Sequence, residues 1–273
     1  MILSVIGGGN MARALIGGLI DTGWPAEHIL VTTRSPESRA KLLRDLGIRE
    51  LSSLSEIRRS DLILLAVKPQ QLFDVAKEIQ PYLSGQLILS VAAGISTSLL
   101  REWLNGYSRI IRAMPNTPAR IHAGMSGLFA TPETSESDRI LARNIFTAIG
   151  RIVWLEKEDD MNALTALSGS GPAYVFYMME ALIEAGIAEG LTTEISTALT
   201  LATFDGASRL AMASQEEVNE LRTKVTSKGG TTEKALEIMI RANIKHILHQ
   251  AVSAAAHRSR EIGNELALMQ KNN

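Results

Sequence analysis

A cluster of glycines directly after the first apolar run constrains the fold more than any other feature of this chain. Residues 2–6 are typical of a short buried strand, and Gly7-Gly8-Gly9-Asn10-Met11-Ala12 follows them at once. A helix is predicted over about residues 11–21. This is the Gly-x-Gly-x-x-Ala dinucleotide fingerprint: Gly7 allows a tight turn, Gly9 lets a pyrophosphate approach the backbone, and Ala12 lets helix and strand pack closely. The spacing predicts a dinucleotide site; a glycine-rich turn without a ligand is the alternative.

The second predicted strand, residues 29–33, ends in Thr32-Thr33-Arg34-Ser35. A site that prefers NADH carries an acidic residue near this point to bind the ribose 2′-hydroxyl, and this segment has none. Arg34 offers a fork of hydrogen-bond donors and Ser35 a hydroxyl, and both groups suit a 2′-phosphate. The sequence therefore favours NADPH, with NADH as a second candidate. An exposed arginine at the start of a loop is the alternative.

Three more apolar runs have the same character, at residues 62–67, 87–91 and 109–113. They end in Lys68-Pro69-Gln70, in Ala92-Ala93-Gly94 and in Met114-Pro115-Asn116-Thr117-Pro118. Ligands of open α/β sheets lie beyond the carboxyl ends of the strands, so these ends are candidate walls of the cofactor site; turns that only reverse the chain are the alternative. The pattern predicts a Rossmann-type, doubly wound parallel sheet. Two further strands are expected near residues 125–130 and 152–155, with a helix between them.

Beyond Trp154 the pattern becomes helical. The polar stretch 156–160 marks the expected boundary between a dinucleotide-binding domain (1–157) and a helical dimerisation and substrate-binding domain (158–273). Helices are predicted over residues 160–167, 172–189, 193–212, 216–225, 231–241 and 244–266. The segment 172–183 is apolar on nearly every face, and a domain of this size has too little interior to cover it. We therefore expect a homodimer through these helices.

Two glycine-containing segments interrupt the helical half. Ser168-Gly169-Ser170-Gly171-Pro172 indicates either a plain turn between helices or a ligand-facing kink. The segment 227–232 brings a glycine pair, Gly229-Gly230, to the start of the helix predicted at Thr231 and Thr232. Unpaired N–H groups at such a helix start suit an anion such as a carboxylate. An ordinary Ser/Thr cap is the alternative.

Composition excludes several classes of protein. A chain of 273 residues with 45% hydrophobic residues is large enough for two domains, and its net charge of −1 without a long basic run argues against nucleic acid. The absence of cysteine excludes disulfides and thiolate chemistry. No carboxylate cluster accompanies His246 and His249, so no metal site is predicted. The start lacks the charged region of a signal peptide and no apolar stretch could span a membrane, so a cytoplasmic protein is expected.

Six motifs in order give the chain a recognisable resemblance. They are the glycine turn at 7–12, Ala-Val-Lys-Pro-Gln at 66–70, Ala-Ala-Gly-Ile at 92–95, Arg-Ala-Met-Pro-Asn-Thr-Pro-Ala at 112–119, Leu-Ser-Gly-Ser-Gly-Pro-Ala-Tyr at 167–174 and Ser-Lys-Gly-Gly-Thr-Thr at 227–232. Over nearly its whole length the chain resembles pyrroline-5-carboxylate reductases, which form L-proline by NADPH-dependent reduction of 1-pyrroline-5-carboxylate. The resemblance implies a Rossmann domain, a helical dimerisation domain and a ring of five dimers.

The resemblance also implies roles for individual residues. Arg34 and Ser35 would hold the adenosine 2′-phosphate. The cofactor set is Ile6, Gly7, Gly8, Gly9, Asn10 and Met11 at the pyrophosphate, Val67, Lys68, Pro69 and Ala93 on the nicotinamide side, together with Ala66, Gly94 and Asn116. The substrate set is Ser227, Gly229, Gly230, Thr231 and Thr232, with Thr232 as the catalytic hydroxyl. The chain departs from the family pattern at Ser53, Lys224 and Lys228, where many relatives carry Asn, Asn and Pro.

Two other functions fit part of the pattern. A small NADP-dependent reductase of keto or hydroxy acids would need a lysine acting on the substrate oxygen, and Lys224 and Lys228 are the candidates near the glycine pair. A dinucleotide-binding regulator without turnover would keep the fingerprint at residues 7–12 and need no ordered substrate turn. Binding of NADPH without oxidation by any imine would favour the regulator.

Overall fold

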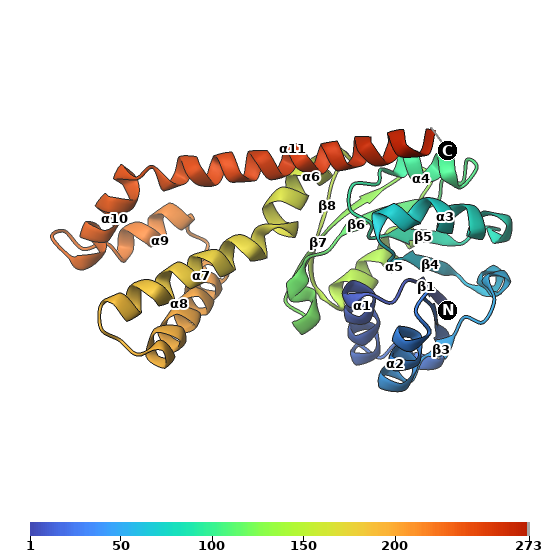
Figure 1. The fold of residues 1–273 in the computed structure, drawn as a ribbon, viewed down its shortest axis with the longest axis horizontal. Helices are drawn as coiled ribbons and strands as arrows, with labels where there is room; N and C mark the ends of the chain where they lie inside the picture. Colours follow the sequence, from blue (N-terminus) through green and yellow to red (C-terminus); the bar gives the residue numbers. More distant parts are fainter. Residues whose placement is uncertain (272–273) are drawn as a thin grey trace. The chain divides into compact units, whose positions relative to one another are not determined.

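The structure is a computed structural model that describes residues 1–271, with side chains described as far as Leu268. Two compact units emerge, Met1–Ser170 together with the chain from Ser253 onward, and Gly171–Val252. The first unit contains an eight-stranded sheet in the order β3-β2-β1-β4-β5-β6-β7-β8 (Figure 1). The strands are β1 (Leu3–Ile6), β2 (Ile29–Thr32), β3 (Arg49–Glu50), β4 (Leu62–Leu65), β5 (Leu87–Ser90), β6 (Ile110–Met114), β7 (Gly124–Ala130) and β8 (Gly150–Trp154).

Helices cover both faces of this sheet, as the doubly wound prediction requires. They are α1 (Asn10–Asp21), α2 (Pro36–Leu46), α3 (Pro69–Ile79), α4 (Thr97–Trp103), α5 (Glu136–Thr147) and α6 (Asp160–Leu164), with short segments η1 (Ala26–His28), η2 (Leu54–Arg59), η3 (Gln80–Tyr82), η4 (Thr117–Ile121) and η5 (Thr165–Gly169). Alternate residues of β4 serve the two faces. Leu62 and Leu64 pack with α1, α2 and α5 in one buried cluster, whereas Ile63 and Leu65 pack with α3 and α4 in another. The sheet is thus apolar on both sides.

The last two strands reverse direction. The neighbours β1 to β6 pair in parallel, β7 pairs antiparallel with β6, and β8 is parallel to β7. A parallel return needs a crossover of a dozen or more residues, and residues 115–123 hold only the short η4 between β6 and β7. The fold class predicted from the sequence is confirmed, and β6 and β7 form the one antiparallel pair among the described strands of this sheet.

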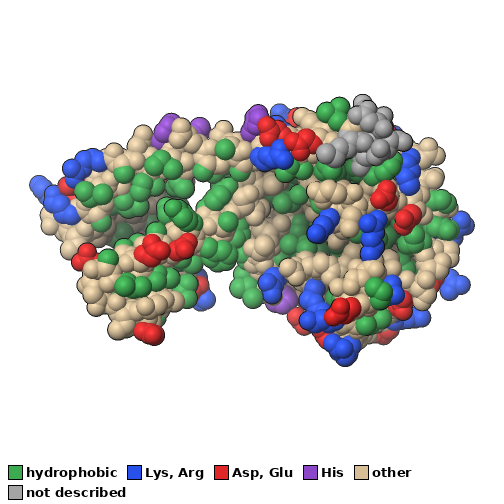
Figure 2. All heavy atoms as spheres, in the orientation of Figure 1, with side chains coloured by type: hydrophobic (Ala, Val, Ile, Leu, Met, Phe, Trp, Pro, Cys, Tyr) green, Lys and Arg blue, Asp and Glu red, His purple; other side chains and the backbone are tan. Residues whose placement is uncertain are grey.

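Four helices and part of a fifth make up the second unit, α7 (Gly171–Ala188), α8 (Thr193–Ala213), α9 (Val218–Lys224), α10 (Thr231–Arg241) and α11 (Ile244–Lys271), whose end belongs to the first unit. Among the described residues 171–252 only Ser196 and Thr200 are buried. Large apolar side chains stay exposed, including Phe176 at 61% and Tyr177 at 72%. Figure 2 shows hydrophobic side chains spread over these helices. A helical unit with this much exposed apolar surface needs cover from another protein surface.

The Ser168–Pro172 segment does not form the turn that its glycines suggested. Residues 165–169 form the π-helical segment η5, and Ser170 keeps right-handed helical dihedrals of −84° and −21° before α7 begins at Gly171. The chain therefore passes from α6 to α7 without leaving helical geometry. π-Helical turns of this kind are rare and often occur at functional sites.

Candidate functional site

A cavity of about 390 Å³ lies at the carboxyl ends of β1, β2 and β4, in the first unit. The strand order reverses here, between β1 and β4, which is where open α/β sheets bind ligands. Nine residues of the predicted cofactor set line this cavity: Ile6, Gly7, Gly8, Gly9, Arg34, Ser35, Ala66, Val67 and Lys68. The volume is in the range of small-molecule sites.

The glycine turn has the geometry that a pyrophosphate requires. Gly7 has a φ of +115°, and a Cβ added to it would lie 2.4 Å from the Ala66 carbonyl oxygen. A Cβ added to Gly9, by contrast, would point into open space, so the space in front of the turn is free. Ala12 is fully buried where α1 packs on the sheet. Gly7 therefore forms the tight turn, Gly9 leaves room for a ligand to approach the backbone, and Ala12 packs helix against sheet, as the fingerprint predicts.

The N-terminus of α1 opens onto the same cavity. Gly9 is the N-cap, and the described side chains include none that caps it. The first N–H groups of the helix are therefore available to an anion and carry the positive end of the helix dipole. These observations fit the phosphates of a dinucleotide.

Arg34 and Ser35 line the cavity where β2 ends. The Arg34 guanidinium lies 3.6 Å from the Asp74 carboxylate, and its side chain is 61% exposed. The Ser35 hydroxyl accepts a hydrogen bond of 3.2 Å from Ser38 N and so caps α2. Arg34 is free to reorient towards a phosphate, whereas Ser35 already has a structural role.

Sequence reasoning missed part of the cavity wall. Thr32, Thr33 and Leu54 line it, as do four residues of α3, Gln71, Val75, Glu78 and Ile79. Gln71 and Glu78 are seven residues apart and therefore share one helix face. That spacing, read from the helix start at Pro69, is the signal that would have identified them.

The remaining members of the predicted cofactor set, Asn10, Met11, Pro69, Ala93, Gly94 and Asn116, lie outside the lining of this cavity. Ala93 and Gly94 follow β5, and Asn116 follows β6. Because neighbouring strands are about 4.8 Å apart, the ends of β2 and β5 are separated by roughly 14 Å along this edge. The Asn116 side chain donates to Ser168 O at 3.2 Å and accepts from Met125 N at 2.9 Å. This amide therefore ties the β6 edge to η5.

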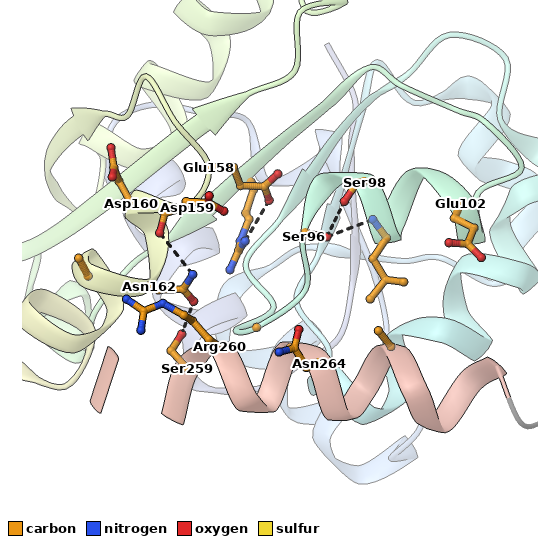
Figure 3. Close-up of a pocket in the computed structure, with 16 residues that line it drawn as sticks. Ser96, Ser98, Glu102, Glu158, Asp159, Asp160, Asn162, Ser259, Arg260 and Asn264 are labelled. Atoms are coloured by element: carbon orange, nitrogen blue, oxygen red, sulfur yellow. Dashed lines mark hydrogen bonds and ion pairs between the residues drawn. The ribbon is translucent and has the colours of Figure 1, made fainter. Parts of the chain in front are cut away.

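A second, larger cavity of about 810 Å³ lies between α4, the start of α6 and the end of α11 (Figure 3). Glu158 is part of its wall. It accepts hydrogen bonds from Thr97 N at 2.7 Å and Thr97 Oγ1 at 2.6 Å, and it forms a 2.9 Å ion pair with the buried Arg112. Gly94 is the one predicted site residue in this wall, whereas the fingerprint residues line the smaller cavity.

The predicted substrate turn belongs to the second unit. Gly230 is the N-cap of α10, and within the described chain no side chain caps this helix, so the ordinary Ser/Thr cap is wrong. Gly229 has a φ of +73° and donates a 2.7 Å hydrogen bond to the Glu233 carboxylate. Thr231 and Thr232 are exposed in the first turn of the helix. An open helix start with two hydroxyls suits a carboxylate ligand.

The three departures from the family pattern have local environments of their own. Ser53 is the N-cap of η2 in a capping box with Glu56. Lys224 forms a 2.5 Å ion pair with Glu216, so its charge is already partnered. Lys228 is exposed in the turn beside Gly229.

None of the described helices is long and apolar enough to cross a membrane. No three His, Asp or Glu side chains in the described part of the chain are grouped as a metal site would require.

Comparison with known families divides the chain in two. Residues 158–262 match the family described as pyrroline-5-carboxylate reductase dimerisation. Residues 2–94 match the family described as NADP oxidoreductase coenzyme F420-dependent. The dimerisation match includes all of α7 to α10, whose apolar side chains are exposed in the single chain. The matched family supports assembly of this chain with copies of itself.

Individual relatives match almost end to end. The chain is 40% identical to a pyrroline-5-carboxylate reductase of Pseudomonas aeruginosa, over 97% of each chain. It is also 40% identical to one of Haemophilus influenzae, over 96% of this chain and 97% of the relative. Among solved structures, that of a pyrroline-5-carboxylate reductase from Coxiella burnetii aligns with a TM-score of 0.91 and 40% identity, covering 95% and 97% of the two chains. A Plasmodium falciparum pyrroline carboxylate reductase solved with NADP bound aligns with a TM-score of 0.86 at 31% identity, over 96% and 98%.

Proposed function

Since the chain belongs to the pyrroline-5-carboxylate reductase family, we propose that it reduces 1-pyrroline-5-carboxylate to L-proline with NADPH, the final step of proline biosynthesis. The observation that carries the proposal is 40% identity to a named reductase over 97% of both chains. The geometry of the glycine turn and the open start of α10 agree with it, because the reaction needs a dinucleotide and a carboxylate site.

In this proposal the cofactor lies along the carboxyl edge of the sheet. Arg34 binds the 2′-phosphate, and the N–H groups from Gly9 to Met11 bind the pyrophosphate. Val67, Lys68, Pro69 and Ala93 border the nicotinamide, with Ala66, Gly94 and Asn116 beside them. When bound, NADPH supplies the hydride that reduces the imine carbon.

The turn before α10 binds the substrate. Ser227, Gly229, Gly230 and Thr231 surround the carboxylate, which the helix N-terminus favours. The Thr232 hydroxyl forms a hydrogen bond to the ring nitrogen and so orients the imine. Either Thr232 donates the proton or the imine binds already protonated, and the pH profile of kcat/KM separates the two. Orientation of the ring provides several kcal/mol of the rate enhancement.

In this proposal each of the two domains has its own function. Residues 1–157 bind the dinucleotide, and residues 158–273 provide the dimer contacts and the substrate turn. The extent of the dimerisation match, residues 158–262, supports this division. We further propose a homodimer through the helices α7 to α11, with five dimers assembled into a decamer. We also propose a cytoplasmic location.

The proposal is tested by mixing the purified protein with NADPH and pyrroline-5-carboxylate. We expect the absorbance of the reduced nicotinamide to fall only when the imine is present, with one proline formed per NADPH consumed. NADPH that binds but is not oxidised, while the imine stays unchanged, contradicts the proposal. In that case a panel of keto acids distinguishes another reductase from a regulator without turnover.

A further inference from the structure

Helix α11 touches the loop after β5 through two glycines. A Cβ added to Gly263 would lie 2.7 Å from the carbonyl oxygen of Gly94, which is closer than Cβ atoms approach other atoms in folded proteins. From the other side, a Cβ on Gly94 would lie 3.1 Å from Ile262 Cγ2 and 3.4 Å from Gly263 N. The backbones of helix and loop are therefore in direct contact, which side chains at these positions would prevent.

This stretch of α11 is fixed on the first unit at successive turns. The Ser259 hydroxyl donates a 2.8 Å hydrogen bond to Asn162 Oδ1 of α6. Ile262 packs against the buried cluster of α3 and α4, and Leu266, 5% exposed, is part of that cluster. Figure 3 shows this part of α11 running along the larger cavity, opposite α4. These contacts hold α11 in place where it touches Gly94.

The loop is held at its far end as well. It runs from Val91 to Ser96, and Thr97, the next residue, donates its N–H and its hydroxyl to the Glu158 carboxylate. Arg112 forms an ion pair with that carboxylate at 2.9 Å. With β5 at one end, Glu158 at the other and α11 against the middle, the positions of Ala93 and Gly94 are strongly constrained.

We infer that Gly263 is a positioning residue for the nicotinamide end of the cofactor site. The inference rests on the proposed function, which puts Ala93 beside the nicotinamide. A glycine inside a helix costs about 1 kcal/mol relative to alanine, so α11 is locally weaker for carrying one. In return, glycine at position 263 allows the carbonyl of Gly94 to lie close to the helix backbone. A side chain at position 263 moves either the helix or the loop, and Ala93 is adjacent to the atom that is pushed.

Gly263→Ala tests this by comparing two ligands. NADPH carries the nicotinamide, whereas 2′-phospho-ADP-ribose carries the same adenosine end without it. We expect the variant to bind NADPH several-fold more weakly by calorimetry and to bind 2′-phospho-ADP-ribose as the wild type does. We also expect kcat with pyrroline-5-carboxylate to fall by about tenfold to a hundredfold, since misplacing reacting groups by about 1 Å has a cost of this order.

Gly17→Ala is the matched control. Gly17 lies in the middle of α1, and a Cβ added there would point into open space. We expect this variant to keep the wild-type affinity for both ligands and the wild-type kcat. Thermal melting without cofactor reports folding for both variants. If Gly263→Ala does not fold, Ile262→Ala takes its place, because it removes the side chain beneath Gly94 without adding an atom.

The inference is overturned if the variant that folds binds both ligands equally more weakly, or if its affinity for neither ligand changes. The binding comparison does not use pyrroline-5-carboxylate. If the wild-type protein fails to reduce this imine, the proposed function is wrong. The two dissociation constants still decide the role of Gly263 in that case.

Discussion

Arg34 occupies the position where the choice between NADPH and NADH is expected to be made. Its guanidinium is 61% exposed and has the Asp74 carboxylate 3.6 Å away, a weak surface pair that a phosphate can displace. We predict that Arg34→Ala weakens NADPH binding by about tenfold to a hundredfold, the value of hydrogen bonds to a charged group, and leaves NADH binding unchanged. Titration of both cofactors measures this.

A second arginine supplies the control for that experiment. Arg44 is 74% exposed on α2, pairs with Asp45 and is not part of the cavity wall. Arg44→Ala should leave both dissociation constants unchanged. If Arg34→Ala weakened the two cofactors equally, Arg34 would not be reading the 2′-phosphate.

Thr232 is the hydroxyl on which the proposed substrate site depends. We predict that Thr232→Ala lowers kcat about a hundredfold, the cost of removing one positioned hydrogen-bond donor, while the dissociation constant of NADPH stays the same. Thr232→Ser should restore most of the activity, since it returns the hydroxyl. Thr223→Ala, which removes a hydroxyl that donates to Asn219 O on α9, is the control. Unchanged turnover in Thr232→Ala removes this residue from the site.

At the level of single elements, the start of α5 carries a pH-dependent contribution to stability. Burial raises the pKa of Asp138, but hydrogen bonds from Arg109 and Ser135 outweigh burial and hold this pKa below its ordinary value. The carboxylate accepts from Ser135 N at 3.0 Å and from Arg109 Nε at 2.9 Å. Since the folded state lowers the pKa, this stabilisation is complete above the ordinary pKa of an aspartate and is lost as the pH falls through the folded value.

Asp138→Asn tests that contribution. We predict a loss of about 1–2 kcal/mol in the free energy of unfolding at neutral pH, reduced from the full value of a charged hydrogen bond because Arg109 is 40% exposed. Denaturant titrations at several pH values should show the difference between variant and wild type shrinking as the pH is lowered below the ordinary aspartate range. A difference independent of pH would assign the loss to packing.

Most elements with a strong apolar period were predictable from the sequence to within one or two residues, but the last helix, expected to end at residue 266, ends at Lys271. The helix predicted at residues 231–241 has these bounds in the structure, and β5 was expected one residue longer than it is. Strand β3 was missed because both of its residues are exposed, which leaves no hydrophobic pattern to read. The π-helical η5 was read as a break because glycine and serine in sequence do not distinguish a turn from a widened helix.

Some residues around the two cavities could also be predicted from the sequence, whereas others could not. The glycine turn and Arg34 were predictable because their chemistry depends on neighbours in sequence. Glu158 was not, since it acts on Thr97, which is 61 residues away. The contact of Gly263 with Gly94 is still more distant along the chain and involves no side chain at all. Such contacts depend on tertiary packing, to which the local sequence gives no signal.

For the whole molecule, the exposed apolar helices require assembly. We predict a dimer or a larger oligomer in light scattering at micromolar concentration. Phe176→Glu, on a side chain 61% exposed on α7, should produce monomers, since it places a charge where apolar surface is to be buried. Ile140→Glu, at a side chain 50% exposed on α5, is the control and should leave the assembly intact. A wild-type monomer at this concentration would contradict the dimer.

The most direct test of the proposed reaction follows the hydride itself. NADPH deuterated at C4 of the nicotinamide, on the transferred side, is incubated with the protein and pyrroline-5-carboxylate, and the product is examined by mass spectrometry and NMR. We predict L-proline with one deuterium at the carbon that was the imine carbon. Proline without deuterium at that carbon, or deuterated cofactor left intact beside unreacted imine, would contradict the assignment of this chain as a reductase of that imine.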